Sequence, residues 1–423
     1  MTTAPPRPAT PDTPSPAGRR RGLRPWARSA LVVAVGMVIL SITATLTGQL
    51  QLTSRGTTQA AVLLSLPILL AGLGGLWSER AGVINIGLEG MMILGTWGAA
   101  WAGYQWGPWA AVIGGAVFGA LGGLLHAIAT VTFTVNHIVS GVAINLLGLG
   151  ITKYLSTLLF YPVSQNPRQS PRVDGFDTYS LQPFADWMAA LEAQQRVLLS
   201  DVAGIVGGLI SGLTPLAIIG FALVPITWYV LWRTRFGLRL RSCGENPVAA
   251  ESLGVNVFTY KYIAVIASGA LAGLGGAALT LNPGQLGYLE GQTGGRGFIG
   301  LAAMIFGNWR PGGLLFGSAL FGYVDGVQLR AGGEAVHALL YAATLLAVAV
   351  AILWAVQKNW RGALVALVAG GVVYAIYLSI ETVPREFAAY APQLVTLLVL
   401  AVASQRLRPP AADGLEYRRG EGD

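Results

Sequence analysis

Long apolar runs, separated by short polar or glycine-rich stretches, fill the chain from residue 30 almost to its end. A helix needs about 20 apolar residues to cross the hydrocarbon core of a bilayer. Runs of this kind predict transmembrane helices at residues 30–48, 58–77, 82–104, 107–130, 137–160, 214–232, 257–281, 311–330, 335–356, 362–380 and 387–403. The pattern therefore predicts an all-α polytopic membrane protein.

The N-terminal residues 1–28 are rich in Pro, Thr, Ala and Arg, and we interpret them as a disordered cytoplasmic tail. The run at 30–48 has two interpretations, because an apolar stretch after basic residues is also typical of a signal peptide. Its length and the long tail before it favour a first membrane helix. The predicted transmembrane domain is 29–403, and a cytoplasmic tail, 404–423, follows it.

Charged residues predict the side of the membrane that each loop faces. The stretch 161–213 is net acidic and poor in Lys and Arg, so we place it outside, whereas the arginine-rich stretch 233–256 is placed in the cytoplasm. The apolar segment 297–307 is too short for a regular crossing. Counting it as a short or broken crossing returns the basic C-terminal tail to the cytoplasm. The prediction is about twelve crossings with both termini inside.

Composition supports a membrane protein and excludes other classes. Only 11% of the residues are charged and 53% are hydrophobic, with a mean hydropathy of +0.58. A soluble domain carries about 25% charged residues. A soluble enzyme, a disordered protein and a nucleic-acid binder are therefore excluded. The net charge of +8 comes from arginines beside apolar runs, which is typical of membrane topology and anionic lipid. The single cysteine, Cys243, excludes an intramolecular disulfide.

Two short sequences recur at one common offset. Ala71–Gly75 is repeated as Ala272–Gly276, and Leu88–Gly90 is repeated as Leu289–Gly291. In the predicted topology the first copy enters the membrane from outside and the second from inside. The repeat therefore predicts two inverted halves, an arrangement found in many transporters.

Motifs for catalysis are absent from the sequence. No lysine follows a glycine, so the phosphate-binding loop of ATPases is missing. The histidines His126, His137 and His337 are too scattered for a zinc-binding helix. We therefore expect no catalytic residues, no metal and no cofactor in this chain.

Polar residues inside the apolar runs are the candidates for a substrate pathway. An ionisable residue within a membrane span is costly, so Glu89 is a functional candidate. A structural carboxylate that bonds to the backbone around Gly87 and Gly90 is an equally weighted alternative. Asn85, one turn before Glu89, can share its face. For the other candidates, hydrogen bonding between helices is the favoured alternative to a pathway role; these are Asn136, His137 and Asn145.

The segment Arg235–Gly254 carries a short helix between two spans. Asn246 and Pro247 are typical of a helix start, and Gly254 is typical of a helix end. Ala249, Ala250 and Leu253 form a small apolar face. So short a helix is marginal alone, which favours docking in a groove of another protein over a solvated loop. The candidate coupling residues are Arg235, Gly237, Gly244, Glu245, Asn246, Pro247, Ala249, Ala250 and Gly254.

The same segment resembles the coupling-helix motif of permeases from ATP-binding cassette (ABC) importers, in the subgroup that includes branched-chain amino acid and ribose permeases. Other stretches resemble its nucleoside and simple-sugar branch: Glu79–Met92, Asn136–Leu147, Gly295–Gly307 and Pro410–Gly420. The similarity covers roughly 58–334 and 385–420. The sequence departs from the branch in its long N-terminal tail and in an inserted helix pair at 335–384.

This resemblance implies the permease subunit of an importer in the bacterial plasma membrane. The implied partners are a second related permease, two cytoplasmic ABC ATPase subunits and an extracytoplasmic substrate-binding lipoprotein, with ATP bound by the ATPases. The implied cargo is a nucleoside, or else a simple sugar. The alternative is an ion-coupled secondary transporter that uses Glu89 as the coupling carboxylate and needs no ATPase.

Overall fold

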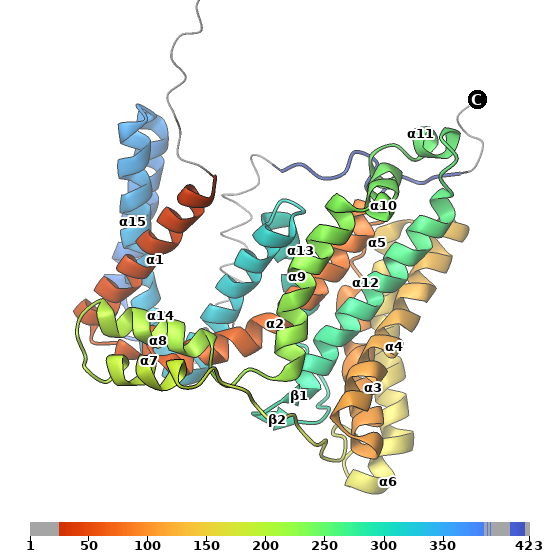
Figure 1. Ribbon diagram of the computed structural model, residues 1–423, viewed down its shortest axis with the longest axis horizontal. Helices are drawn as coiled ribbons and strands as arrows, with labels where there is room; N and C mark the ends of the chain where they lie inside the picture. Colours follow the sequence, from red (N-terminus) through yellow and green to blue (C-terminus); the bar gives the residue numbers. More distant parts are fainter. Residues whose placement is uncertain (1–24, 385–386, 388–389, 391–406, 419–423) are drawn as a thin grey trace, which may run out of the picture.

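A computed structural model describes residues 25–384, 387, 390 and 407–418 (Figure 1). Most of the predicted N-terminal tail and the predicted span 387–403 lie outside the described residues. Within them the chain is predominantly helical, as predicted. In this described part of the chain, seven helical stretches are long and apolar enough to cross a membrane. These observations confirm a polytopic all-α membrane protein.

The long helices follow the predicted apolar runs closely. Glycine or proline stands at several of their ends, for example at both ends of α3 and α13, so the apolar pattern and the breakers agree there. Their bounds are α1 (Pro25–Thr47), α2 (Arg55–Arg80), α3 (Leu88–Trp106), α4 (Pro108–Ala127), α5 (His137–Leu155), α9 (Pro215–Arg233), α12 (Val257–Thr280), α13 (Arg296–Phe306), α14 (Pro311–Val356) and α15 (Trp360–Ser379). A π-helical turn extends each of α4 and α5, at Ile128–Thr132 and Ser156–Phe160.

The predicted spans 311–330 and 335–356 form two helices that are labelled together as α14. They meet at a kink at Gly332, where the backbone is not helical. The φ angle of Gly332 is 68°, a left-handed conformation that glycine adopts without a steric penalty. The second half of α14 and α15 pair as a hairpin, so the predicted inserted helix pair 335–384 appears as a helical unit at the edge of the bundle (Figure 1).

Short elements gather at the two ends of the bundle (Figure 1). We call the end that carries the β1–β2 hairpin the hairpin end, and the opposite end the α10–α11 end. The hairpin end carries α6 (Tyr161–Ser164), α7 (Phe184–Glu192), α8 (Leu199–Leu209), β1 (Leu281–Asn282) and β2 (Gln285–Leu286). The strands pair antiparallel, with Leu281 opposite Leu286. The α10–α11 end carries α10 (Arg235–Glu245) and α11 (Pro247–Ser252).

Acidic residues of the predicted external stretch fasten α7 and α8 to the bundle. Asp201 accepts hydrogen bonds from the hydroxyls of Ser41 in α1 and Thr53 before α2. Glu192 accepts one from the backbone N–H of Arg55, at 2.9 Å. Two of the acidic residues in 161–213 therefore form hydrogen bonds within the protein.

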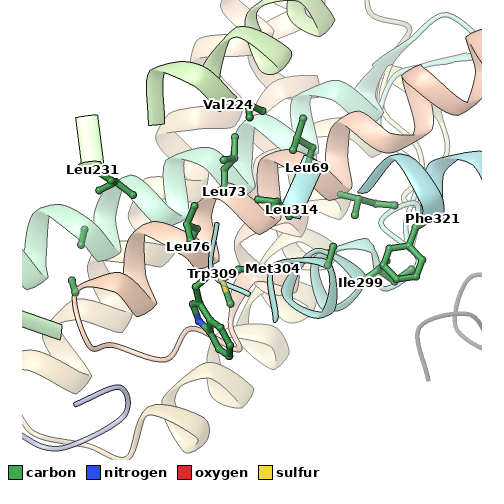
Figure 2. Packing of buried hydrophobic residues seen from close by; sticks show 14 of the residues in the cluster. Leu69, Leu73, Leu76, Val224, Leu231, Ile299, Met304, Trp309, Leu314 and Phe321 are labelled. Atoms are coloured by element: carbon green, nitrogen blue, oxygen red, sulfur yellow. The ribbon is translucent and has the colours of Figure 1, made fainter. Parts of the chain in front are cut away.

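Helix α2 lies at the centre of the main core. Its side chains Leu69, Leu73 and Leu76 meet those of α13, of α14 and of α9, as Figure 2 shows. Leu69, Leu73 and Leu76 are fully buried. Burial of a leucine side chain stabilises a fold by about 1.5–3 kcal/mol in water. In a bilayer the same contacts act mainly through close packing.

Glycines bring α4 and α12 into backbone contact. A Cβ atom on Gly119 would overlap the carbonyl oxygen of Gly269, and one on Gly273 would overlap that of Gly115. Gly95 of α3 lies against the backbone of Gly273 in the same way. Helices approach this closely only where small residues face each other. These glycines therefore join α3, α4 and α12 into one tightly packed block.

Candidate functional site

An unwound segment, Ala81–Gly87, separates α2 from α3. Helix α2 ends at Arg80, and Gly82 has a φ angle of 81°. The Ser78 hydroxyl donates a hydrogen bond to the carbonyl oxygen of Val83. Because the segment is enclosed by helices, its backbone groups need partners from their side chains.

Asn145 of α5 holds the end of the unwound segment. Its Nδ2 donates to the carbonyl oxygen of Ile86 at 3.1 Å, and its Oδ1 accepts from the N–H of Gly90 at 2.7 Å. One amide thus satisfies a donor and an acceptor on either side of the start of α3. The Asn145 side chain therefore links α5 to the start of α3 by hydrogen bonds.

Two histidines hold the middle of the segment at Ile84. His126 Nε2 lies 3.0 Å from the carbonyl oxygen of Ile84, and His126 Nδ1 lies 2.8 Å from the Ser140 hydroxyl. His137 Nδ1 accepts from the N–H of Ile84 at 3.3 Å. Both histidines are buried. His137 is one of the candidates predicted from the sequence. His126 is not among them, although its position within an apolar run was a signal for it.

Asn85 lies at the most enclosed point of the segment. It is fully buried, and its Nδ2 donates to the hydroxyl of Ser268 in α12 at 2.9 Å. Its Oδ1 has no hydrogen-bond partner among the described residues. An unpaired buried carbonyl costs about 1–3 kcal/mol. Asn85 is therefore the candidate with spare hydrogen-bonding capacity.

Glu89 caps a second helix break. Its Oε1 accepts from the N–H of Gly295 at 3.0 Å and its Oε2 from the N–H of Gly297 at 2.7 Å. These N–H groups lie at the start of α13, where a helix leaves donors unsatisfied and carries a partial positive charge. A Cβ on Gly297 would lie 2.6 Å from Glu89 Cα, so the approach requires glycine. The carboxylate joins α3 to α13.

A charged pair beside this cap was missed from the sequence. Arg296, the first residue of α13, contacts Asp325 of α14 with Nη2 3.1 Å from Oδ2. The side chains are only 22% and 12% exposed. Arg296 Nη1 also approaches the carbonyl oxygens of Gln292 and Thr293, at 3.4 and 3.3 Å. An ionisable residue inside the run 311–330 was the signal that pointed to Asp325.

Asn136 stands apart from this group. Its Oδ1 accepts from the N–H groups of Ile138 and Val139 at 3.0 and 3.2 Å, so it caps the start of α5. The residue is exposed. The structure therefore brings Asn85, His137 and Asn145 together at the unwound segment and leaves Asn136 at its margin.

The predicted coupling segment forms two helices at the α10–α11 end. Glycines seat α10 on the bundle, because a Cβ on Gly237 would overlap the carbonyl oxygen of Val230, and one on Gly244 that of Arg80. Glu245 follows them, with Oε1 3.8 Å from Arg80 Nη1. The α10 helix is thereby fixed to the ends of both α9 and α2.

The short helix α11 starts and stops where the sequence analysis expects. Asn246 Oδ1 accepts from the N–H of Ala249 at 3.0 Å, Pro247 is the first helical residue, and Gly254 has a φ angle of 80°. One residue differs from the expectation. Ala250 is 3% exposed and packs with Cys243 inside the chain, so it does not share the exposed face of Ala249.

The large exposed apolar side chains here are instead Val248 of α11 and Leu253, which directly follows α11, at 41% and 84% exposure. Arg235 is exposed at the start of α10. Burial raises the pKa of the Cys243 thiol to about 11, so this cysteine is an unreactive packing residue. Among the described residues, no group of three or more His, Cys, Asp or Glu side chains could hold a metal ion.

The C-terminal segment 407–418 completes this end of the molecule. Ala412 N–H donates to the carbonyl oxygen of Gly244 at 2.9 Å, and Gly414 N–H approaches that of Gly82 at 3.4 Å. Burial raises the pKa of Asp413 to about 7, against the lowering effect of neighbouring Lys261 and Arg80. The segment therefore touches both α10 and the unwound segment.

Comparison with known proteins assigns the chain to a family. The family model for the permease component of the branched-chain amino acid transport system matches residues 57–349, which is more than half of the chain. A helical bundle with seven candidate membrane spans among the described residues agrees with a membrane permease. The chain belongs to this family and is the transmembrane, non-catalytic permease component of an ABC transporter. The resemblance stated from the sequence is confirmed.

Curated relatives match over most of their length. The chain is 31% identical over 369 residues to the guanosine ABC transporter permease protein NupQ of Bacillus subtilis, covering 86% of this chain and 96% of the relative. It is 32% identical over 368 residues to the nucleoside ABC transporter permease protein NupC of Lactococcus lactis, covering 84% and 94%. A putative glucose ABC transporter permease of Haloferax volcanii is 35% identical over 281 residues, or 65% and 76%. No solved structure matches the chain.

Proposed function

We propose that this permease imports nucleosides, with simple sugars as the second candidate cargo, across the bacterial plasma membrane. The observation that carries the proposal is the match to the guanosine permease of Bacillus subtilis over 96% of that protein. The nucleoside permease of Lactococcus lactis matches over 94% of its length, whereas the glucose permease matches over 76%. Nucleosides are therefore favoured over sugars.

Energy for import would enter through α10 and α11. As an ABC permease the chain works with ATPase partners, and α11 is a capped helix with exposed Val248 and Leu253 at one end of the bundle. Closure of the ATPase pair would move α10, which contacts Arg80 and thereby the unwound segment. The unwound segment and the start of α13 are the places where backbone can rearrange, because they lack continuous helical bonds.

The partner set is completed by a second permease and an external binding protein. Bacillus subtilis has a further relative, the guanosine permease NupP, which is 26% identical over 262 residues. Two different permeases of one system would form the pathway between them. A substrate-binding lipoprotein would deliver cargo at the hairpin end, which lies opposite α10 and α11 (Figure 1).

The orientation and the internal symmetry belong to the same proposal. Both termini and the α10–α11 end face the cytoplasm, and 161–213 faces outside. The repeated sequence Ala71–Gly75 lies in α2 before the unwound segment, and Ala272–Gly276 lies in α12 before the break that precedes α13. This placement supports two inverted halves, each with an interrupted crossing.

The deciding experiment is uptake in a strain that lacks its own nucleoside transporters. Cells that express the permease with its ATPase, second permease and lipoprotein should accumulate labelled guanosine in competition with other nucleosides. If the cells take up glucose and no nucleoside, the cargo is a sugar. Uptake that survives ATP depletion with the ion gradient held would favour the ion-coupled alternative based on Glu89. The two backbone hydrogen bonds to Glu89 favour a structural role for that carboxylate.

A further inference from the structure

The C-terminal segment 407–418 lies along α10 and α11. Beyond its bond to Gly244, Ala411 N–H donates to Glu245 Oε2 at 3.3 Å. The Tyr417 hydroxyl donates to the carboxylate of Glu251 in α11. The Tyr417 ring also packs on Phe258, with centroids 5.8 Å apart. Two segments far apart in the sequence are thus bonded into one surface at the α10–α11 end.

A groove of about 300 Å³ runs between them. Pro247 and Val248 line it from α11, and Ala411 and Leu415 line it from the C-terminal segment. Val248 is 41% exposed and Leu415 is 59% exposed. Leu253 stands at the C-terminal end of α11, 84% exposed. Apolar side chains gathered around a groove outside the membrane indicate a surface that a protein covers.

Charged side chains of both signs line the groove, namely Glu245, Glu416 and Arg418. Glu245 contacts Arg80, and Glu416 contacts Arg418. A protein that enters the groove is therefore expected to place apolar side chains at its centre and polar groups at its rim.

We propose that the ATPase subunit docks on a composite surface made of α11 and the C-terminal segment together. Leu253 and Val248 supply one side of the contact, and Leu415 supplies the other. The inference rests on the proposed coupling role of α10 and α11 and extends it to residues near the end of the chain. The partner is an apolar element of the ATPase with polar side chains around it.

Hydrogen bonds of the C-terminal segment connect the proposed docking surface to the helix bundle. Gly414 N–H approaches the carbonyl oxygen of Gly82 in the unwound segment at 3.4 Å. Arg408 N–H donates to Asn308 Oδ1, after the end of α13, at 2.8 Å. An ATPase that displaces the C-terminal segment therefore acts on both broken crossings directly, in addition to acting through α10.

The test compares three leucines of the full-length permease expressed with its ATPase subunit. Leu415→Asp places a charge on the new side of the surface, and Leu253→Asp places one on α11. Leu181→Asp is the matched control, because Leu181 is 64% exposed at the hairpin end. Both groove variants should lower recovery of the ATPase by about tenfold, while the control retains it. Equal gel-filtration profiles of the permease show that all three fold.

The outcomes separate the two proposals. Loss of the ATPase with Leu253→Asp but full retention with Leu415→Asp overturns the composite surface and leaves the coupling role intact. Retention by all variants overturns the coupling role as well. If Leu415→Asp keeps the ATPase and instead loses binding to vesicles of phosphatidylglycerol, the groove serves lipid and the inference fails.

Discussion

The side chain of Glu89 links two helices that are far apart in the sequence. It joins the first turn of α3 to the first turn of α13 through two N–H groups, at 3.0 and 2.7 Å. Hydrogen bonds to an ionised acceptor are stronger than neutral ones, about 1.5–3 kcal/mol each. The donors are backbone groups at the start of α13, where the helix itself offers them no acceptor.

Replacing Glu89 by Gln should weaken both the fold and transport. The amide nitrogen would face a backbone N–H, so one of the two bonds is lost at a cost of about 1–3 kcal/mol. We expect a lower melting temperature in detergent and reduced uptake. Glu290→Gln is the control, because that carboxylate forms an exposed contact, 3.5 Å from Arg168. Normal uptake and melting by Glu89→Gln would show that the charge is dispensable.

The carboxyl of Asp413 should make stability depend on pH. Burial raises its pKa from 3.8 to about 7 in the folded protein. A raised carboxyl pKa contributes stability that is full below about pH 4 and is lost as pH rises through 7. The melting temperature of the wild type should therefore fall more between pH 5 and pH 8 than that of Asp413→Asn. Parallel pH profiles for the two proteins would contradict the assignment.

At the scale of elements, the sequence predicts helices well and their partners poorly. The start of α11 at Asn246 and Pro247 follows from local chemistry, and so do the short helix α13 and the long apolar runs. The bond from Glu89 to Gly295 spans 206 residues, and no local pattern encodes it. The burial of Ala250 was missed for a similar reason, since the cluster that covers it includes Tyr417 from the C-terminal segment.

The backbone contact between α4 and α12 should not tolerate a single methyl group. Gly273→Ala would press a Cβ into the carbonyl oxygen of Gly115, and overpacking of this kind costs about 1–3 kcal/mol. We expect less folded permease by gel filtration and a lower melting temperature. Gly150→Ala in α5 is the matched control, because no atom lies within 4 Å of a Cβ there. The control should be neutral or slightly stabilising, since alanine favours helix.

For the whole molecule, the orientation in the membrane is the next quantity to measure. The turn between α14 and α15 points toward the same end as α10 and α11 (Figure 1). Lys358 lies in this turn and Arg361 follows it, in accord with a cytoplasmic location.

Cysteine labelling in intact cells tests that orientation. In a Cys243→Ser background, Asp177→Cys at the hairpin end should react with an impermeant maleimide, whereas Gln357→Cys should react only after lysis. Both positions are exposed. Equal labelling at the two positions before lysis would contradict the proposed topology.

The glycine contacts among α3, α4 and α12 also restrict where a solute can travel. Where the backbone of Gly119 meets that of Gly269, there is no room even for a methyl group, and a nucleoside is far larger. Widening that seam would require all three helices to separate along their length. In the proposed function the route for cargo therefore runs beside this block, along faces of the subunit that a second permease would enclose. Part of the channel wall would then belong to another polypeptide.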